Sequence, residues 1–297
     1  MSKKDFTIAI PTYNRYLYLK EIINRLHYQI EKINLEIDIL IVDDGSTDET
    51  YLISNEYKKL IYIKNENNLG IAKTRNLLVK YSNSKYIIFI DSDVIPSENF
   101  LIEHIKNARE NYILQGVNIL IPSIDMIGKN FNLLTDASNS FFDTSNLCIE
   151  KKLIEEANYF DENFYYGWED IELGIRLKKN KNIKFIKNKL AIGYHLKTFP
   201  NNLEDEFNKE KNRAKGAIYF YNKYKTLEVK AITQINKISY IYFIVLKKLF
   251  FYNIIILLSK NLYYKNFYNI SMFIFRFYMN LFYLNECFNQ INKNKLN

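Results

Sequence analysis

Disulfide-forming and chain-breaking residues are scarce in this chain of 297 residues, which has 2 cysteines, 4 prolines and 8 glycines. Cys148 and Cys287 are too few and too far apart for a disulfide scaffold or a cysteine-based zinc site, so we expect a reducing compartment. Because hydrophobic residues make up 48% of the chain, the composition excludes a disordered protein and predicts a substantial core.

Two kinds of segment are also missing near the start of the chain. Residues 1–5 contain no apolar leader and run into a strand-like stretch over 6–10, so we expect no secretion. No glycine-rich phosphate loop follows that stretch, which argues against a nucleotidyltransferase. No internal repeat is visible either.

Acidic residues are rare in the C-terminal third. Residues 207–297 contain 15 lysines and arginines but 3 glutamates, a balance of +12, whereas residues 1–206 carry −4. This tail is also rich in aliphatic and aromatic residues. Lys247 and Lys248 would lie near the middle of any spanning helix. Placing a charged side chain at the centre of a bilayer costs roughly 2.5–3.5 kcal/mol for each lysine. The pattern therefore favours a membrane-surface helix; the alternative is a helical subdomain packed on the rest of the chain or on a second copy.

The first 200 residues alternate strand-like and helix-like segments in the manner of βαβ units, and the short connections favour parallel pairing. The break around Pro200 predicts an α/β domain over 1–200 and a helical region over 201–297. Strands are expected near 6–10, 36–43, 61–64, 86–91, 117–122, 141–149, 183–186 and 190–194. Helices are expected near 16–30, 47–58, 70–82, 97–110, 150–158 and 170–180, and a loop or hairpin arm over 123–140.

Two pairs of aspartates stand directly after strand-like apolar runs. Ligands bind beyond the carboxyl ends of strands in an open α/β sheet, so these carboxylates are expected to face a ligand. Asp91 and Asp93 can share a hard cation such as Mg²⁺ or Mn²⁺ with substrate phosphates; two solvated acids in a turn are the alternative. Asp43 and Asp44 remain unexplained by local structure, and one of them could accept a hydrogen bond from a base N–H.

Local structure explains the residues that directly follow Asp44. Ser46 with Glu49 three residues later can form a capping box for the helix expected over 47–58.

Arg75, on the helix expected over 70–82, could meet a base carbonyl or a phosphate, and an ordinary surface ion pair is the alternative. His195 follows a strand-like run and could complete a metal site, although a lone histidine there is more often structural.

The only tryptophan lies in a third acidic motif, residues 167–170, at the start of an expected helix. Asp170 could cap that helix, or it could serve as the base that a group transfer to a hydroxyl requires. Trp168 could offer an apolar face to a sugar ring.

Taken together and in order, these motifs resemble the inverting family 2 glycosyltransferases of the GT-A fold. The segments that carry the resemblance are 10–15, 42–48, 68–76 and 91–93. Residues 167–177 look like the acceptor-side motif of galactosyl- and N-acetylgalactosaminyl-transferases and of chondroitin-polymerase-like enzymes. The resemblance spans roughly residues 5–200 and implies a Rossmann-like, mostly parallel sheet flanked by helices.

The resemblance also implies an activity. The expected reaction moves a sugar from a nucleotide-sugar, a UDP-hexose or UDP-N-acetylhexosamine, to a hydroxyl of a glycan or lipid-linked acceptor in bacterial surface-polysaccharide synthesis. A divalent cation, Mn²⁺ or Mg²⁺, would neutralise the leaving diphosphate, and the in-line displacement would invert the anomeric carbon. We expect the enzyme in the cytoplasm, at the inner face of the plasma membrane, with no nucleic-acid partner.

Site roles follow from the matching positions. The nucleotide would be held by Pro11, Thr12, Asn14, Arg75 and the Asp43–Asp44 pair; Asp91 would meet the ribose or a metal-bound water; Asp93, with Asp91 and His195, would hold the metal; Asp170 would be the base, Glu169 its acceptor-binding partner and Trp168 an acceptor contact. Two alternatives remain: a catalytically silent nucleotide-sugar binder, which has no need of Glu169 and Asp170, and a membrane-associated assembly protein that depends on the tail.

Overall fold

A computed structural model describes residues 5–33, 35–57, 59–128, 141–164, 166–200, 202–247, 252–265 and 267–295. The chain forms two compact units. The N-terminal unit comprises Met1–Glu162 and Glu169–Lys197, and the C-terminal unit comprises Asn163–Trp168 and Thr198–Asn297. Each unit has hydrophobic clusters of its own.

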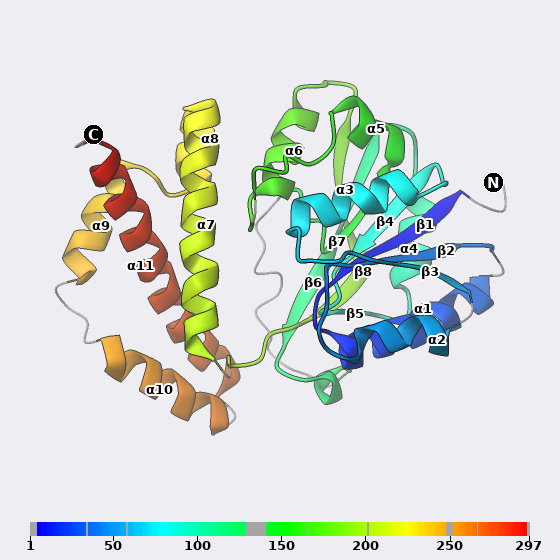
Figure 1. The fold of residues 1–297 in the computed structure, drawn as a ribbon, viewed down its shortest axis with the longest axis horizontal. Coiled ribbons are helices and arrows are strands. Elements are labelled where there is room, and N and C mark those ends of the chain that lie inside the picture. Colours follow the sequence, from blue (N-terminus) through cyan, green and yellow to red (C-terminus); the bar gives the residue numbers. More distant parts are fainter. Residues whose placement is uncertain are drawn as a thin grey trace. The chain divides into compact units, whose positions relative to one another are not determined.

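The N-terminal unit is built on one sheet, with the strand order β3-β2-β1-β4-β7-β6-β8-β5 (Figure 1). β3, β2, β1 and β4 are neighbours in that order and pair in parallel, and β6 pairs in parallel with β8. β7 and β5 run antiparallel to their neighbours. The strands are β1 (Phe6–Thr12), β2 (Asp38–Asp43), β3 (Leu60–Lys64), β4 (Tyr86–Ile90), β5 (Val94–Pro96), β6 (Tyr112–Ile121), β7 (Asn146–Glu150) and β8 (Lys184–Leu196).

Successive side chains of a strand point to opposite faces of the sheet, and in the buried central strands the side chains on both faces are apolar. Helices therefore cover both faces of this sheet. Ile8 and Ile10 of β1 pack with α1 and α4, whereas Ala9 packs with α3, α5 and α6. The helices are α1 (Tyr16–Ile33), η1 (Glu49–Leu52), α2 (Ile53–Glu56), α3 (Ile71–Tyr81), α4 (Phe100–Asn107), η2 (Ile124–Met126), α5 (Lys151–Glu156) and α6 (Glu169–Lys178). The expected α/β class is confirmed.

Two details of the segment after β2 differ from the expectations. The helix expected over 47–58 is two short pieces, η1 and α2, and the capping box is wrong. Asp48, not Ser46, caps η1 by accepting from the N–H of Thr50, because the Ser46 hydroxyl is already bonded to the N–H of Asn14 at 2.8 Å. Asn14 belongs to the loop after β1, so the sequence around Ser46 gives no sign of this bond.

Three further differences concern strands. β7 begins at Asn146 rather than at 141, and most of the arm expected over 123–140 lies outside the described residues. β8 is one continuous strand whose pairing with β6 shifts register, where two strands were expected. β5 was not expected at all; it forms because β8 offers an edge for antiparallel pairing, with Val94 opposite His195.

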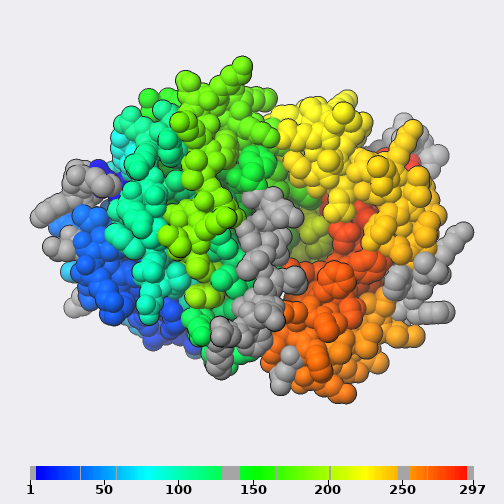
Figure 2. Space-filling model, turned by 180° about the vertical axis from the view of Figure 1, so that it is seen from behind, coloured from blue at the N-terminus to red at the C-terminus, as the bar shows by residue number. Residues whose placement is uncertain are grey.

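The C-terminal unit is helical. Its core joins α7 to α11 through apolar side chains such as Ala217, Leu284 and Cys287, and Phe199 packs with α10 and α11. Figure 2 shows parts of α10 and α11, coloured orange to red, at the surface of the molecule. The helices are α7 (Leu203–Tyr224), α8 (Leu227–Ile232), α9 (Lys237–Lys247), α10 (Tyr252–Tyr264) and α11 (Tyr268–Lys295). Within the described part of the chain, no helix combines the length and hydropathy needed to cross a bilayer.

A pair of glycines tests how tightly the loop after β2 is built. Gly45 has φ +79°, and a Cβ there would lie 2.7 Å from the carbonyl carbon of Asn67; Gly128 has φ +78° and nothing within 4 Å. Both Gly→Ala changes incur the left-handed backbone cost of about 1–2 kcal/mol. We expect Gly45→Ala to lower the free energy of unfolding by roughly 1–3 kcal/mol more than Gly128→Ala, since only Gly45→Ala creates a collision. Urea titrations followed by far-ultraviolet circular dichroism measure the difference, and equal losses would contradict it.

Candidate functional site

The carboxyl ends of β1 and β2 form one rim of the site. Thr12 and Asp43 are register partners, and the N–H of Asp44 donates to the carbonyl of Thr12 at 2.8 Å. Pro11 and Thr12 are buried at the end of β1. The Thr12 hydroxyl has no hydrogen-bond partner among the described residues, so it is a polar group available to a ligand.

Asp43 and Asp44, which no local motif explained, hold the loops that follow β2 and β3. Asp43 accepts from the N–H of Ser46 at 2.8 Å and from the Tyr62 hydroxyl. Burial and this bond to Asp43 raise the pKa of Tyr62. Asp44 accepts from the N–H of Leu69 at 2.8 Å and of Gly70 at 3.0 Å, and from the Asn65 side chain at 2.9 Å. A carboxylate offers about four acceptor positions, so Asp44 retains capacity for one further donor.

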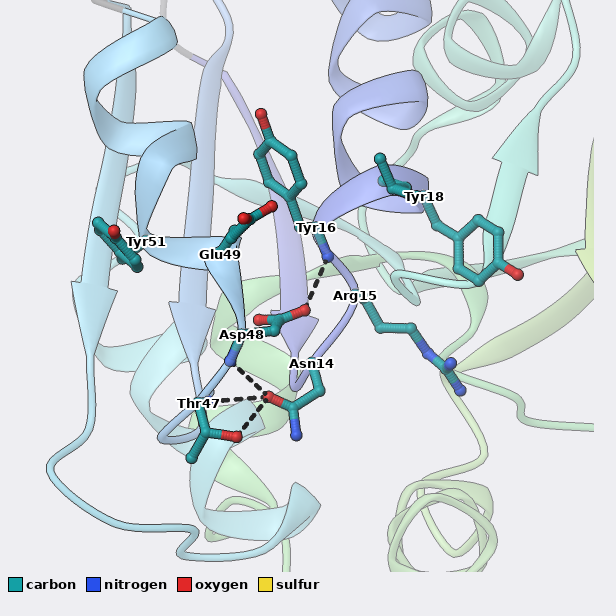
Figure 3. A pocket seen from close by; sticks show the side chains of 9 residues that line it. Asn14, Arg15, Tyr16, Tyr18, Thr47, Asp48, Glu49 and Tyr51 are labelled. Carbon is teal, nitrogen blue, oxygen red and sulfur yellow. Dashed lines mark hydrogen bonds between the residues drawn. The ribbon is translucent and has the colours of Figure 1, made fainter. Parts of the chain in front are cut away.

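Asn14 connects the loop after β1 to the loop after β2. It adopts the left-handed conformation, φ 52°, and its side-chain oxygen accepts from the N–H of Thr47 at 2.8 Å (Figure 3). The two loops border a pocket of about 740 Å³. Its lining is Asn14, Arg15, Tyr16, Leu17, Tyr18, Thr47, Asp48, Glu49 and Tyr51. Of the residues predicted from the sequence, Asn14 alone lines this pocket, so the pocket does not bring the other predicted site residues together.

Arg75 lies at the centre of the site, between two carboxylates from different elements. Its Nη2 is 3.1 Å from Asp91 at the end of β4, and its Nη1 pairs with Glu169 at the start of α6. The side chains of Arg75 and Glu169 are 5% and 4% exposed, and that of Asp91 is 28% exposed. The ion pair is therefore internal to the protein, in contrast to the surface pair considered from the sequence.

The charges of this group depend on one another. Burial raises the pKa of Glu169, and the guanidinium of Arg75 opposes that shift. Arg75 stays protonated, because Asp91 and Glu169 raise its pKa against the effect of burial. Removing Arg75 would leave the buried Glu169 carboxylate without its partner, which typically costs about 3–5 kcal/mol.

Asp93 and His195 meet because β5 pairs with β8. His195 Nε2 lies 3.4 Å from one Asp93 oxygen, and Lys197 Nζ lies 4.0 Å from the other. Burial would raise the pKa of Asp93, but His195 and Lys197 hold it well below its usual range. The carboxylate is therefore ionised at neutral pH.

The donor set at Asp93 fits a divalent cation only in part. Within the described ranges, no three histidine, cysteine or acidic side chains lie close enough together to hold a metal. Asp93 supplies oxygen atoms and His195 an imidazole, while Asp91 stands two residues away on the same turn. Mg²⁺ is commonly held by one or two carboxylates and completes its shell with substrate phosphates and water, so this small set suits it.

Asp170 lies at the start of α6, next to Glu169. Its Oδ1 accepts from the N–H of Ile171 at 2.7 Å. Burial, followed by the charges of Glu169 and Asp143, raises its pKa well above the ordinary value. A carboxylate with a raised pKa accepts a proton more readily near neutral pH.

Asp143 is a neighbour that the sequence reasoning missed. It precedes β7, and its Oδ1 accepts from the N–H and hydroxyl of Ser145 at 3.0 and 2.6 Å. Because β7 is antiparallel to β4, with Ile90 opposite Asn146, the amino end of β7 reaches the edge where β4 ends. The sequence reasoning placed Asp143 inside a strand expected from 141, whereas β7 begins at Asn146 and leaves Asp143 in the segment before it.

Trp168 packs differently from the role expected for it. The segment Asn163–Trp168 belongs to the C-terminal unit. There the indole N–H of Trp168 donates to the carbonyl of Arg213 at 2.8 Å, and the ring lies near Phe220 and Tyr283. Contact between Trp168 and an acceptor sugar stays a prediction.

Comparison with known proteins places this chain among the glycosyltransferases. A family model described as Glycosyl transferase family 2 matches residues 7–162. The poly(ribitol-phosphate) beta-N-acetylglucosaminyltransferase TarS of Staphylococcus aureus is 34% identical over 92 residues, 30% of this chain and 16% of that protein. The minor teichoic acid biosynthesis protein GgaB of Bacillus subtilis is 30% identical over 154 residues, 50% of this chain and 16% of that protein. Those matches therefore cover a small part of each relative.

Two solved structures show the likeness in fold. Residues 1–349 of S. aureus TarS in complex with UDP-GlcNAc match with a TM-score of 0.52 and 20% identity, over 73% of this chain and 67% of that one. The mannosyltransferase PcManGT of Pyrobaculum calidifontis, in complex with GDP-Man and Mn²⁺, matches with a TM-score of 0.62 and 12% identity, over 96% of this chain and 87% of that one. These likenesses confirm the expected GT-A fold with its C-terminal helices.

The raised pKa of Asp170 predicts a pH-dependent cost to stability. Because the folded protein holds this proton more tightly than the unfolded chain, stability falls as pH rises from the ordinary aspartate pKa toward the raised one. Asp170→Asn should therefore be more stable than wild type at pH 7, by a margin that shrinks toward pH 4.5. Urea unfolding across this pH range measures the margin.

Glu66→Gln is the matched control for that series, since Glu66 is an exposed acid. Its stability should stay within about 0.5 kcal/mol of wild type at every pH. A margin for Asp170→Asn that is negative, or that does not vary with pH, would contradict the assignment.

Proposed function

Because this chain belongs to glycosyl transferase family 2, we propose that it is an inverting enzyme that transfers a sugar from a UDP-hexose or UDP-N-acetylhexosamine to a hydroxyl of a glycan or lipid-linked acceptor. The observation that carries this proposal is the ion pair of Arg75 with Asp91 and Glu169. Through Arg75, this ion pair connects Asp91, which is expected near the donor, with Glu169, which belongs to the acidic pair expected near the acceptor.

The acceptor class is proposed from the relatives. TarS and GgaB carry names that refer to poly(ribitol-phosphate) and teichoic acid, so we propose a role in the synthesis of a bacterial cell-surface polysaccharide. A TarS structure with bound UDP-GlcNAc supports UDP-N-acetylglucosamine as the first donor to try. The acceptor side would be the 167–170 segment, as in the chondroitin-polymerase-like enzymes it resembles.

The donor would lie on the rim formed by the ends of β1, β2 and β4. The unpartnered Thr12 hydroxyl and the remaining acceptor position of Asp44 support contacts with the nucleoside, beside Pro11 and Asn14. Asp43 would act by holding the loop in place. Arg75 would orient Asp91 toward the ribose or a metal-bound water and leave its own Nε, which lacks a partner in the described chain, for the donor.

A divalent cation, Mn²⁺ or Mg²⁺, would be held by Asp93 with Asp91 and His195, and when bound it supplies charge neutralisation for the leaving diphosphate. Ionised Asp93 and the neighbouring imidazole support this assignment. The Mn²⁺ complex of the mannosyltransferase with a similar fold is consistent with it.

Asp170 is the proposed base. It would take the proton of the acceptor hydroxyl while that oxygen bonds to the anomeric carbon and the bond from this carbon to the diphosphate oxygen breaks. Attack from the side opposite the leaving group inverts the anomeric configuration. Glu169, held by Arg75, would contact the acceptor and keep the start of α6 close to the donor side of the site.

We propose that residues 1–200 form the catalytic domain and that residues 207–297 contact a membrane at its cytoplasmic face. The support is an apolar stripe on the exposed side of α9 at helical spacing, continued on α10. Its members are Ile238, Ile241, Tyr242 and Val245, then Ile254, Leu257 and Leu258. Between 231 and 297 the sequence has eight lysines and arginines but one glutamate, so an anionic lipid surface complements it.

Nucleotide binding tests the donor proposal. Thermal-shift titrations with UDP, GDP, CMP and dTDP, each with and without Mn²⁺, should show stabilisation by UDP that depends on metal, because a ligand that binds the folded state raises its stability. Asp93→Asn should lose at least about tenfold in apparent UDP affinity, equivalent to about 1.4 kcal/mol.

Asp205→Asn, an exposed acid in α7, is the matched control for the donor titration and should behave as wild type. Stabilisation by none of the nucleotides would contradict the transferase proposal and favour the assembly-protein alternative. Metal-dependent UDP binding with no transfer to any glycan acceptor would favour the silent binder.

Vesicle flotation tests the membrane proposal. The double variant Ile241→Glu and Leu257→Glu places charges at positions that are 62% and 61% exposed, so it should fold normally. We expect it to bind vesicles of phosphatidylglycerol and phosphatidylcholine at least about tenfold more weakly than wild type, because a charge at the interface opposes insertion of the apolar stripe. Leu17→Glu, at a 74% exposed position in α1, should bind as wild type does. Equal flotation of all three proteins would overturn the proposal.

A further inference from the structure

The residues that lead into β7 lie between the end of β4 and α6, all within the N-terminal unit. On one side, the N–H of Asp91 donates to the carbonyl of Ser145 at 3.3 Å. On the other side, Phe142 is fully buried in a cluster that includes apolar side chains of α6. The segment 141–146 is therefore a second connection between the end of β4 and α6, in addition to the ion pairs of Arg75.

Close packing fixes the contact of this segment with α6. A Cβ added to Gly174, on α6, would lie 2.6 Å from the Cβ of Phe142 and 3.0 Å from Cε2 of Phe141. Only glycine leaves room for this approach, so helix and segment are in direct contact. A displacement of the segment would therefore displace α6, which carries Asp170 in its first turn.

One glutamine side chain holds the segment on the sheet. Gln115, on β6, is 4% exposed. Its Oε1 accepts from the N–H of Asp143 at 2.6 Å. Its Nε2 donates to the carbonyl of Asp143 at 3.1 Å and to that of Asn146 at 2.9 Å. This single side chain therefore restrains both ends of the loop from Asp143 to Asn146.

The same loop determines where the Asp143 carboxylate lies. Its Oδ1 is bonded to the N–H and hydroxyl of Ser145, and that hydroxyl also accepts from the Asn118 side chain at 2.7 Å. Burial is the main cause that raises the pKa of Asp91 and of Asp170, and the negative charge of Asp143 adds to both shifts. Asp143 therefore lies close enough to act on both acids.

We propose that Gln115 is a positioning residue. By holding the loop that precedes β7, it keeps Asp170, on α6, in place relative to Asp91, at the end of β4. The consequence for catalysis rests on the proposed transferase function, whereas the positioning itself does not. The arginine network links the same two sides by charge, and this second link consists of neutral hydrogen bonds and close packing.

A second glutamine provides a matched control. Gln29, on α1, is also 4% exposed; its Oε1 accepts from the N–H of Leu101 at 2.9 Å, and its Nε2 donates to the carbonyl of Ser97 at 3.0 Å. These bonds join α1 to the start of α4, where the proposed function assigns no residue. A Gln→Met substitution at either position removes the bonds and nearly keeps the volume, so both variants should lose comparable stability in urea titrations.

Hydrogen exchange of the full-length protein tests the positioning. The amide of Asp91 should exchange at least about tenfold faster in Gln115→Met than in wild type or Gln29→Met, because its acceptor lies in the released loop. Asp91 has no hydrogen bond to Gln115 among the described residues, so the effect reaches it only through that loop. Unchanged exchange at Asp91 in Gln115→Met would overturn the inference.

Kinetics test the consequence for transfer. With UDP-N-acetylglucosamine as the probe and water as the acceptor, Gln115→Met should release UDP with a kcat at least about tenfold below wild type, while KM stays within about twofold. The proposed nucleoside contacts lie on the loops after β1 and β2, which this variant leaves in place. Gly174→Ala should show the same pattern, although alanine favours a helix more than glycine does, because its Cβ would collide with Phe142.

The control separates positioning from a general loss of stability. Gln29→Met should keep the kcat of wild type, and an equal fall of kcat in Gln29→Met and Gln115→Met would overturn the inference. If wild type releases no UDP, the proposed function fails for this donor, and the amide exchange of Asp91 still decides the inference.

Discussion

The arginine at position 75 is the interaction on which the rest of the site depends. Its guanidinium pairs with carboxylates from the end of β4 and the start of α6, so three elements meet at one buried cation. Burying charges costs several kcal/mol per ion, and the mutual attraction offsets that cost only when partners and geometry are well matched. The arrangement therefore restricts where Asp91 and Glu169 can lie, and it brings the proposed donor and acceptor sides into one charge network.

The same use of acids recurs along the rim. Asp43, Asp44 and Asp48 each accept backbone N–H donors, and in doing so they hold the loops that follow β1, β2 and β3. Left-handed residues, Asn14 and Gly45 among them, let those loops turn tightly enough to meet. Acids that look like ligands in the sequence are thus partly structural, and this leaves a rim whose shape is set before any donor arrives.

The C-terminal unit has two distinct features. Its own core contains an aromatic cluster with Trp168, Phe220 and Tyr283, and α9 and α10 present aliphatic side chains to solvent within a strongly basic segment. Under the proposed function, the exposed aliphatic side chains and the basic charge of this unit would keep the enzyme near a membrane-bound acceptor.

The sequence by itself determined the α/β class, most of the strands and helices, and the acids at the strand ends, because hydrophobic periodicity and turn residues act over a few neighbouring positions. It also identified the family. Only the tertiary structure decided that Arg75 pairs with Glu169, 94 residues away, that β5 brings His195 beside Asp93, and that Trp168 joins the C-terminal helices. Each of these outcomes is a choice among distant partners, and packing makes that choice, since nothing in the local pattern distinguishes one buried partner from another.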